Sequence, residues 1–294
     1  MSRNSSRLLK AMKGWSTALN SYSDVPKGLF GRKAIITSWA VTIDSDELDF
    51  EFEIENDDDL EANEQTVTVY NLSKNTIKNL IVGKSISIKA GYKNDIGIVC
   101  SGHISKVKTK RSGVDKVTTI YILDSMGLEE KDLANVTYAK GTKASYILKD
   151  LINKTHLPIA AFHPKRDWTY KEEVTINGGL MDSIRKYSEV CGISTWINQG
   201  KVYSCTITSK SNGYFNLNVD TGLLDSAEET EKTITAEDYE DKITVINAKC
   251  LLQHRIIVGS VVKLKSLEYN GEYRVRKCKH IFSPDESYTE LELI

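Results

Sequence analysis

The segment from Leu48 to Glu55 constrains the fold more than any other part of the chain, because apolar and acidic residues alternate strictly along it. The apolar members are Leu48, Phe50, Phe52 and Ile54, and the acidic members are Asp49, Glu51, Glu53 and Glu55. In an extended chain, successive side chains point to opposite faces. The alternation therefore predicts a β-strand with one face in a hydrophobic core and the other in water.

Further strand-like segments surround this one at short intervals, and glycines separate several of them. They cover residues 35–43, 66–70, 85–90, 96–107 and 117–123. Such spacing predicts an antiparallel β domain of about 100 residues, closed or sandwiched. One short helix is expected after Leu72, because Ser73 can cap its first turn.

The middle of the chain changes to helical spacing. Apolar residues fall on one helical face over 144–152 and again over 180–191, where Gly192 ends the pattern. The pair Gly178-Gly179 is interpreted as the entry to the second helix. A β-hairpin is expected next, with strands over 193–197 and 201–207, because the Asn and Gly of the turn between them tolerate positive φ.

The last part of the chain returns to strands. They are expected over 214–219, 242–252, 260–265, 272–281 and 288–294, with turns at Asn270-Gly271 and Pro284-Asp285 and an acidic surface connection over 225–241. The predicted organisation is therefore an arm over 1–30, a first β domain over 31–135, a small α+β domain over 136–210 and a second β domain over 211–294.

Charge and cysteine content exclude several classes of protein. The 294 residues include 39 basic and 40 acidic side chains, so the net charge of -1 gives no general attraction to nucleic acid or to an anionic membrane. No apolar run approaches the roughly 18 residues of a membrane span. The five cysteines are scattered without a Cys-x-x-Cys pair, which indicates buried thiols in a reducing compartment. The N-terminus lacks the apolar core of a secretion signal, so we expect synthesis in the cytoplasm.

Residues 3–33 form a basic segment in this otherwise neutral chain, with Asp24 as its only acid. A docking arm, or a terminal helix on the protein's own body, is the favoured interpretation. A membrane-surface helix or a transit peptide is the alternative.

The residue patterns of hydrolases, metal sites and nucleotide sites are missing from the sequence. No Gly-x-Ser-x-Gly motif occurs. The histidines are single residues without zinc-ligand spacing: His103, His156, His163, His254 and His280. We therefore expect no catalytic, cofactor-binding or metal-binding residues, and no enzyme.

Carboxylates are the one abundant reactive group, with twelve between Asp44 and Glu64 and no Lys or Arg among them. A calcium loop or a glycosidase pair would need such groups. Residues 57–59 lack the glycine and terminal Glu of a calcium loop, and regular alternation is typical of a solvated strand face. The favoured interpretation is therefore a strand face exposed to water. The alternatives are a calcium site, a catalytic pair, and a surface that uses its negative charge without any reaction.

Short motifs in both β regions resemble those of a known family. The most specific are Asn71-Leu72-Ser73 and Asn270-Gly271-Glu272-Tyr273, and others cover 66–70, 90–92, 97–102, 114–118, 221–224, 243–252, 255–264 and 279–280. Together they resemble phage tail baseplate hub proteins, the double-barrel hubs of contractile tails that also occur in phage-tail-like bacteriocins. The resemblance implies a mainly β fold with an α+β insert, in which two tail-tube-like antiparallel β-barrel domains flank a small helix-hairpin domain.

The resemblance also implies a structural role in the baseplate of a virion tail or tailocin particle. Three copies would form a ring that joins the hexameric tail tube to the central spike. The implied partners are the tail tube protein, the spike protein, other baseplate proteins and the tape measure protein, with no membrane and no cofactor. In a phage, DNA would pass through without specific binding. Because the chain ends in the expected strand 288–294, hydrolase activity would belong to another protein.

Two functional alternatives concern particular side chains. A cell-wall or carbohydrate binding module would use Trp39, Trp168, Trp196 and Tyr170 as stacking platforms, although such aromatics are more often core residues. In a hub, a DNA channel should be lined by negative charge. The acidic clusters Asp57-Asp58-Asp59 and Glu228-Glu229-Glu231 are the candidates for that lining, with an outer solvated loop as the alternative for each.

Overall fold

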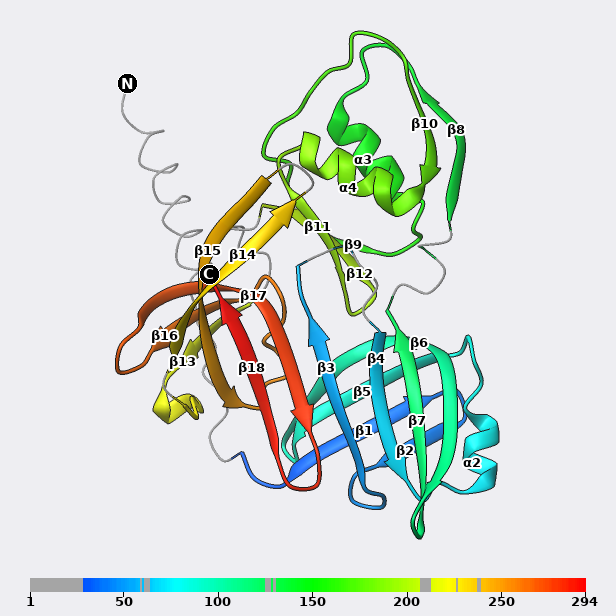
Figure 1. The fold of residues 1–294 in the computed structure, drawn as a ribbon, viewed down its shortest axis with the longest axis vertical. Helices are drawn as coiled ribbons and strands as arrows, with labels where there is room; N and C mark the ends of the chain where they lie inside the picture. Colours follow the sequence, from blue (N-terminus) through cyan, green and yellow to red (C-terminus); the bar gives the residue numbers. More distant parts are fainter. Residues whose placement is uncertain are drawn as a thin grey trace, which may run out of the picture.

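The computed structural model describes residues 29–58, 60, 64–124, 128, 131–206, 213–225, 227–236 and 239–294. Of the predicted basic arm over 1–30, only Leu29 and Phe30 are among them. The described residues form mainly strands with a small helical part (Figure 1), which confirms the predicted fold class. In this part of the chain no helix combines the length and apolar character needed to cross a membrane.

The first β unit is an antiparallel sheet in the order β3-β4-β7-β6-β5-β1-β2. Its elements are β1 (Arg32–Ser38), β2 (Val41–Asp44), β3 (Phe50–Asn56), β4 (Glu64–Tyr70), α2 (Lys74–Asn79), β5 (Ser85–Tyr92), β6 (Asp95–Ser112) and β7 (Asp115–Leu123). Ser73 caps α2 as predicted, since its Oγ accepts from the Thr76 amide at 3.0 Å. The expectation of one strand over 35–43 is wrong, because the chain reverses at Trp39, whose φ of 37° ends β1.

The middle unit contains α3 (Ala144–Asn153) and α4 (Leu180–Val190), and both predicted helices are confirmed. Gly179 is the N-cap of α4, as the sequence indicated. The strands are β8 (Asp132–Tyr138), β9 (Ile159–Phe162), β10 (Val174–Gly179), β11 (Ser194–Asn198) and β12 (Lys201–Cys205). β11 and β12 form the expected hairpin, but the positive φ angles belong to Gln199 and Gly200, because Asn198 remains in the strand opposite Lys201.

The second β unit contains β13 (Tyr214–Leu217), the 3-10 helix η1 (Val219–Thr221), β14 (Glu228–Ala236), β15 (Tyr239–Leu251), β16 (Val261–Lys265), β17 (Asn270–Phe282) and β18 (Ser287–Leu293). Two expectations fail here. The acidic segment over 225–241 is not a surface connection, because β14 pairs along its whole length with β15. The pair Asn270-Gly271 begins β17 instead of forming a turn, since Gly271 lies opposite Leu264. The turn at Pro284-Asp285 is confirmed.

The two β units share one sheet of 13 strands, because β3 pairs antiparallel with β17 (Figure 1). Three hydrophobic clusters lie in the described residues: one in the first β unit, one around α3 and α4, and one in the second β unit. The hairpin of β11 and β12 joins the last two, because Trp196 packs in the second-unit cluster and Ile197 in the helical cluster. The pairing of β3 with β17 joins the first β unit to the second, and the hairpin joins the helical cluster to the second β unit.

Candidate assembly surface between the two β units

The junction of β3 and β17, called the seam below, is apolar on its inner side. The pairing runs from Phe52 opposite Phe282 to Asn56 opposite Cys278. The Phe52 and Phe282 rings stack with centroids 5.4 Å apart, and Phe282 belongs to the hydrophobic cluster of the first unit. A residue from the end of the chain thus completes a core built by its beginning. This burial stabilises the two units together.

The outer side of the seam is charged. The Lys279 Nζ lies 2.5 Å from a Glu53 carboxylate oxygen, and the Lys277 Nζ lies 2.6 Å from one of Glu55. The hydrogen bond to Glu53 raises the pKa of Lys279. The acidic alternation of β3 was correctly interpreted as an outward face, but two of its carboxylates have lysine partners. The sequence signal for those partners was the alternation of Lys277 and Lys279 with buried Cys278 and His280.

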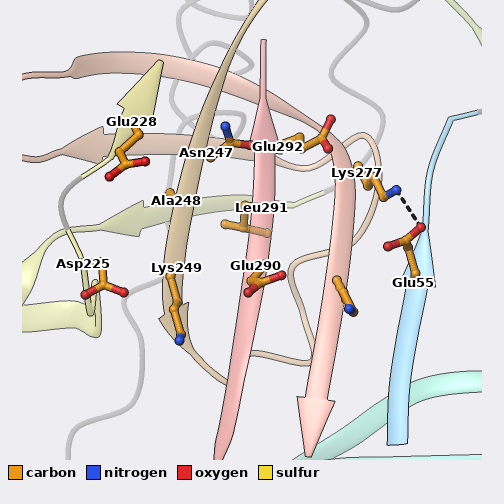
Figure 2. A pocket seen from close by; sticks show the side chains of 11 residues that line it. Glu55, Asp225, Glu228, Asn247, Ala248, Lys249, Lys277, Glu290, Leu291 and Glu292 are labelled. Atoms are coloured by element: carbon orange, nitrogen blue, oxygen red, sulfur yellow. Dashed lines mark ion pairs between the residues drawn. The ribbon is translucent and has the colours of Figure 1, made fainter. Parts of the chain in front are cut away.

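The charges continue as rows across four strands. Strand register places Glu55 opposite Lys279, Lys279 opposite Glu290, and Glu290 opposite Lys249. Figure 2 labels Glu55, Glu290 and Lys249 of this row and marks the ion pair between Lys277 and Glu55. They line a shallow hollow of about 570 Å³, with Asp225 at its margin. Acids and bases alternate along this row, whereas the full lining of the hollow contains five acids and three lysines.

A buried ion cluster lies beside the seam. An Asp58 oxygen accepts from Arg274 Nη1 at 3.0 Å, and Arg276 Nε lies 3.5 Å from the other oxygen. The side chains of Asp58 and Arg274 are 7% and 4% exposed. The Arg274 guanidinium also lies 5.2 Å from the centre of the Trp196 ring. Asp58 is therefore not available as a channel-lining charge, which corrects the prediction for this residue. Asp57 is partly exposed, and Asp59 lies outside the described residues.

A second polar junction connects β6 to the loop after β15. Arg255 donates two hydrogen bonds to the Asp95 carboxylate, one of them at 2.7 Å, and this contact lowers the pKa of Asp95. The neighbouring His254 ring packs directly over Gly97, where a Cβ would lie 2.0 Å from Cδ2 of that ring. Glycine at this position permits the close approach of the two units.

Buried His280 completes this junction. Its Nδ1 lies 2.9 Å from the Thr289 hydroxyl, and burial lowers the pKa of the ring to about 4, with His254 adding to the effect. Burial also lowers the pKa of His254. Both rings are therefore neutral at pH 7. Within the described residues, no group of three or more His, Cys, Asp or Glu side chains is placed to hold a metal ion.

The remaining candidate residues are separated by the fold. Trp196 is fully buried and stacks on Tyr203. Trp39 and Trp168 are exposed, but one belongs to the first β unit and the other to the middle unit, so these tryptophans form no common platform. All five cysteines are buried and unbridged, and burial raises the pKa of Cys100, Cys250 and Cys278 to about 12. Glu228, Glu229 and Glu231 are exposed on β14.

Comparison with solved structures places this fold among phage tail proteins. The chain is similar to a tail protein from Neisseria meningitidis MC58, with a TM-score of 0.62 and 11% identity over 90% of this chain and 96% of that one. It is also similar to the 43 kDa tail protein of prophage MuSo2 from Shewanella oneidensis, with a TM-score of 0.62 and 6% identity over 89% and 97%.

A third similar structure is the Escherichia coli c3393 protein, with a TM-score of 0.59 and 10% identity over 88% of this chain and 76% of that one. That protein is described as a component of the type VI secretion system with structural similarity to the T4 tail proteins gp27 and gp5. No protein-family model matches the sequence, and no curated protein does. The chain has the fold of tail hub proteins, as its short motifs predicted.

Proposed function

We propose that this protein is the structural baseplate hub of a phage tail or phage-like particle. In this role three copies form a ring that joins the hexameric tail tube to the central spike. Two observations support the proposal. The fold is shared with tail proteins over about nine tenths of the chain, and each chain carries two β units joined in one sheet.

The seam is the observation that carries the proposal. The two β units are joined by strand pairing, the stacked pair Phe52 and Phe282, and the buried contact of Asp58 with Arg274. In this proposal each copy acts as one two-unit segment. Three such segments supply six β units, the number needed to match a six-fold tube at one end and a three-fold spike at the other.

We assign the outer face of the seam as a candidate channel wall in this ring. Acids and lysines alternate along its central row, and the hollow there is lined by five acids and three lysines. Tight binding of DNA requires many unpaired basic groups facing phosphates, whereas Lys277 and Lys279 each have a carboxylate partner. DNA could pass such a wall without being held.

The basic arm over 1–30 is proposed to contact a neighbouring tail protein or to extend toward the tape measure protein. This proposal rests on the charge excess of the segment alone. Deletion of residues 1–20 should leave the unfolding transition of the chain unchanged and reduce the yield of complete tails. Normal particles from the deleted chain would contradict it.

We propose no hydrolytic role for this chain. Two acidic side chains of β3, Glu53 and Glu55, have lysine partners, and burial keeps the thiols of Cys100, Cys250 and Cys278 protonated at neutral pH. The purified chain should not clear peptidoglycan in a zymogram. Clearing that disappears on a single change such as Glu51→Gln would contradict this proposal.

Native mass spectrometry tests the hub proposal. The full chain should give a trimer near three times its mass of 33.0 kDa, and addition of the tail tube protein should increase the trimeric fraction. A chain that remains monomeric up to its solubility limit, with and without the tube protein, would contradict the proposal.

A further inference from the structure

Exposed apolar side chains gather at one corner of the second β unit, called the η1 corner here. Val219, Leu224 and Leu267 are 79%, 47% and 92% exposed. All three line one hollow of about 370 Å³ between η1 and the turn before β17. Large apolar side chains that gather in an exposed hollow are typical of a protein contact.

A second group lies at a corner of the first β unit, called the α2 corner. Trp39, Ile81 and Val82 are 74%, 44% and 54% exposed. The Lys84 Nζ lies 4.8 Å from the centre of the Trp39 ring, and the Lys84 amide donates to the Ile81 carbonyl. The tryptophan therefore lies beside the loop that follows α2.

The two corners have opposite charge. Residues 218–231, which include η1 and the start of β14, contain five acids and no Lys or Arg. Residues 71–94, which include α2 and β5, contain five lysines and no acid. Asp220 and Asp225 line the apolar hollow at the first corner, together with Lys265 as a single base. Lys78 and Lys84 are exposed at the second corner. Each corner therefore has an apolar centre next to charged side chains, and the charges at one corner are opposite in sign to those at the other.

The corners also lie on opposite sides of the lower part of Figure 1, near the two ends of the 13-stranded sheet. In Figure 1, α2 is at the far right, and η1 is the short yellow turn at the lower left near β13. Trp39 is in the turn that leads into β2, the last strand at one end of the sheet. The Leu224 amide donates to the Lys249 carbonyl of β15, which pairs with β14, the last strand at the other end. Asp225 lines both this hollow and the hollow on the outer face of the seam, so the η1 corner borders that face.

We propose that the η1 corner of one copy binds the α2 corner of the next copy, head to tail. Such a contact joins different surfaces, so repetition gives a closed ring when the rotation closes. The inference rests on the proposed trimer and identifies the surfaces that would form it. The occupant of each corner is thus a second copy of this chain. At the seam within one copy, the first β unit contributes the acids and the second β unit contributes the lysines. In the proposed contact between copies, the first β unit contributes the lysines instead.

Charge reversal and its rescue test the contact. One variant carries Asp220→Lys and Asp225→Lys, and a second carries Lys78→Glu and Lys84→Glu. Each places like charges together, so we expect the dissociation constant of the trimer to rise at least roughly tenfold in sedimentation velocity. A variant with all four changes should recover wild-type association, because opposite charges then face again.

Two apolar changes provide a matched comparison. Leu267→Glu should weaken the trimer, whereas Val114→Glu should not, because Val114 is 97% exposed in the turn between β6 and β7 and belongs to neither corner. Trp39→Asn should also weaken it while preserving the fold, since asparagine tolerates the positive φ of this position.

The outcomes separate this inference from the hub proposal. A trimer whose stability is unchanged by either charge reversal, or a four-change variant no better than the two-change variants, overturns the head-to-tail contact and leaves the hub intact. A wild-type chain that never associates overturns both. Loss of the trimer in each reversed variant, with recovery in the combined one, supports the contact.

Discussion

The buried contact of Asp58 with Arg274 gives a quantitative test of how the two β units are joined. Asp58→Asn keeps the shape of the side chain and removes its charge. The Arg274 guanidinium is then left 4% exposed, without the carboxylate that now lies 3.0 Å from Nη1. Two of its nitrogens, Nε and Nη2, already lack hydrogen-bond partners.

Breaking a buried pair by removing one member costs about 3–5 kcal/mol, because the other charge remains out of water. Glu53→Gln at the outer side of the seam is the matched control. Glu53 is 65% exposed, so its contact with Lys279 should contribute at most about 1 kcal/mol. With an m-value of about 3 kcal/mol/M in urea, Asp58→Asn should lower the unfolding midpoint by about 1–1.7 M, and the control by at most about 0.3 M.

Trp196 fluorescence can follow the transition, because the ring is fully buried beneath Arg274. A double variant, Asp58→Leu with Arg274→Met, should recover most of the lost stability, since no unpaired charge remains between these positions. A midpoint within 0.2 M of the wild type for Asp58→Asn, on the order of the control, would refute this reasoning. So would a double variant less stable than the single one.

Three other changes follow from the junctions. Because His280 has a pKa of about 4 in the folded chain and 6.5 ordinarily, the unfolded chain binds its proton more readily. Stability should therefore fall by about 3 kcal/mol as pH drops from 6.5 to 4, and His280→Gln should flatten this slope in urea titrations. Gly97→Ala should lower the thermal midpoint through its clash with His254, and His254→Ala should relieve that loss. Trp196→Ala should cost about 3–5 kcal/mol in urea unfolding, and a loss below 1 kcal/mol would show that the ring is not a core residue.

Local patterns predicted most of the individual elements. The alternation along β3 placed Phe50, Phe52 and Ile54 in the core, where each is at most 3% exposed. Helical spacing predicted the bounds of α3 and α4 to within one residue, and Ser73 marked the start of α2. These features depend on neighbours in the sequence, so the sequence alone was sufficient.

Long-range pairing explains the failures. The Glu-rich residues 228–231 look like a solvated connection, yet they belong to β14 because β15 offers a complete partner edge. The seam pairs Phe52 with Phe282. The residues around Phe52 do not indicate that it pairs with Phe282, and those around Phe282 do not indicate Phe52. Trp39 is exposed and Trp196 is buried, although both lie in or next to strands. The difference in their exposure likewise depends on tertiary position. The candidate surface therefore required the structure.

Electron cryomicroscopy of the chain assembled with its tail tube and spike proteins tests the hub proposal most directly. The map should contain three copies in a ring with a central channel, six β units facing the tube, and the η1 corner of each copy against the α2 corner of the next. A map in which the chain lies outside the tube axis, or in a number of copies other than three, would contradict the proposal.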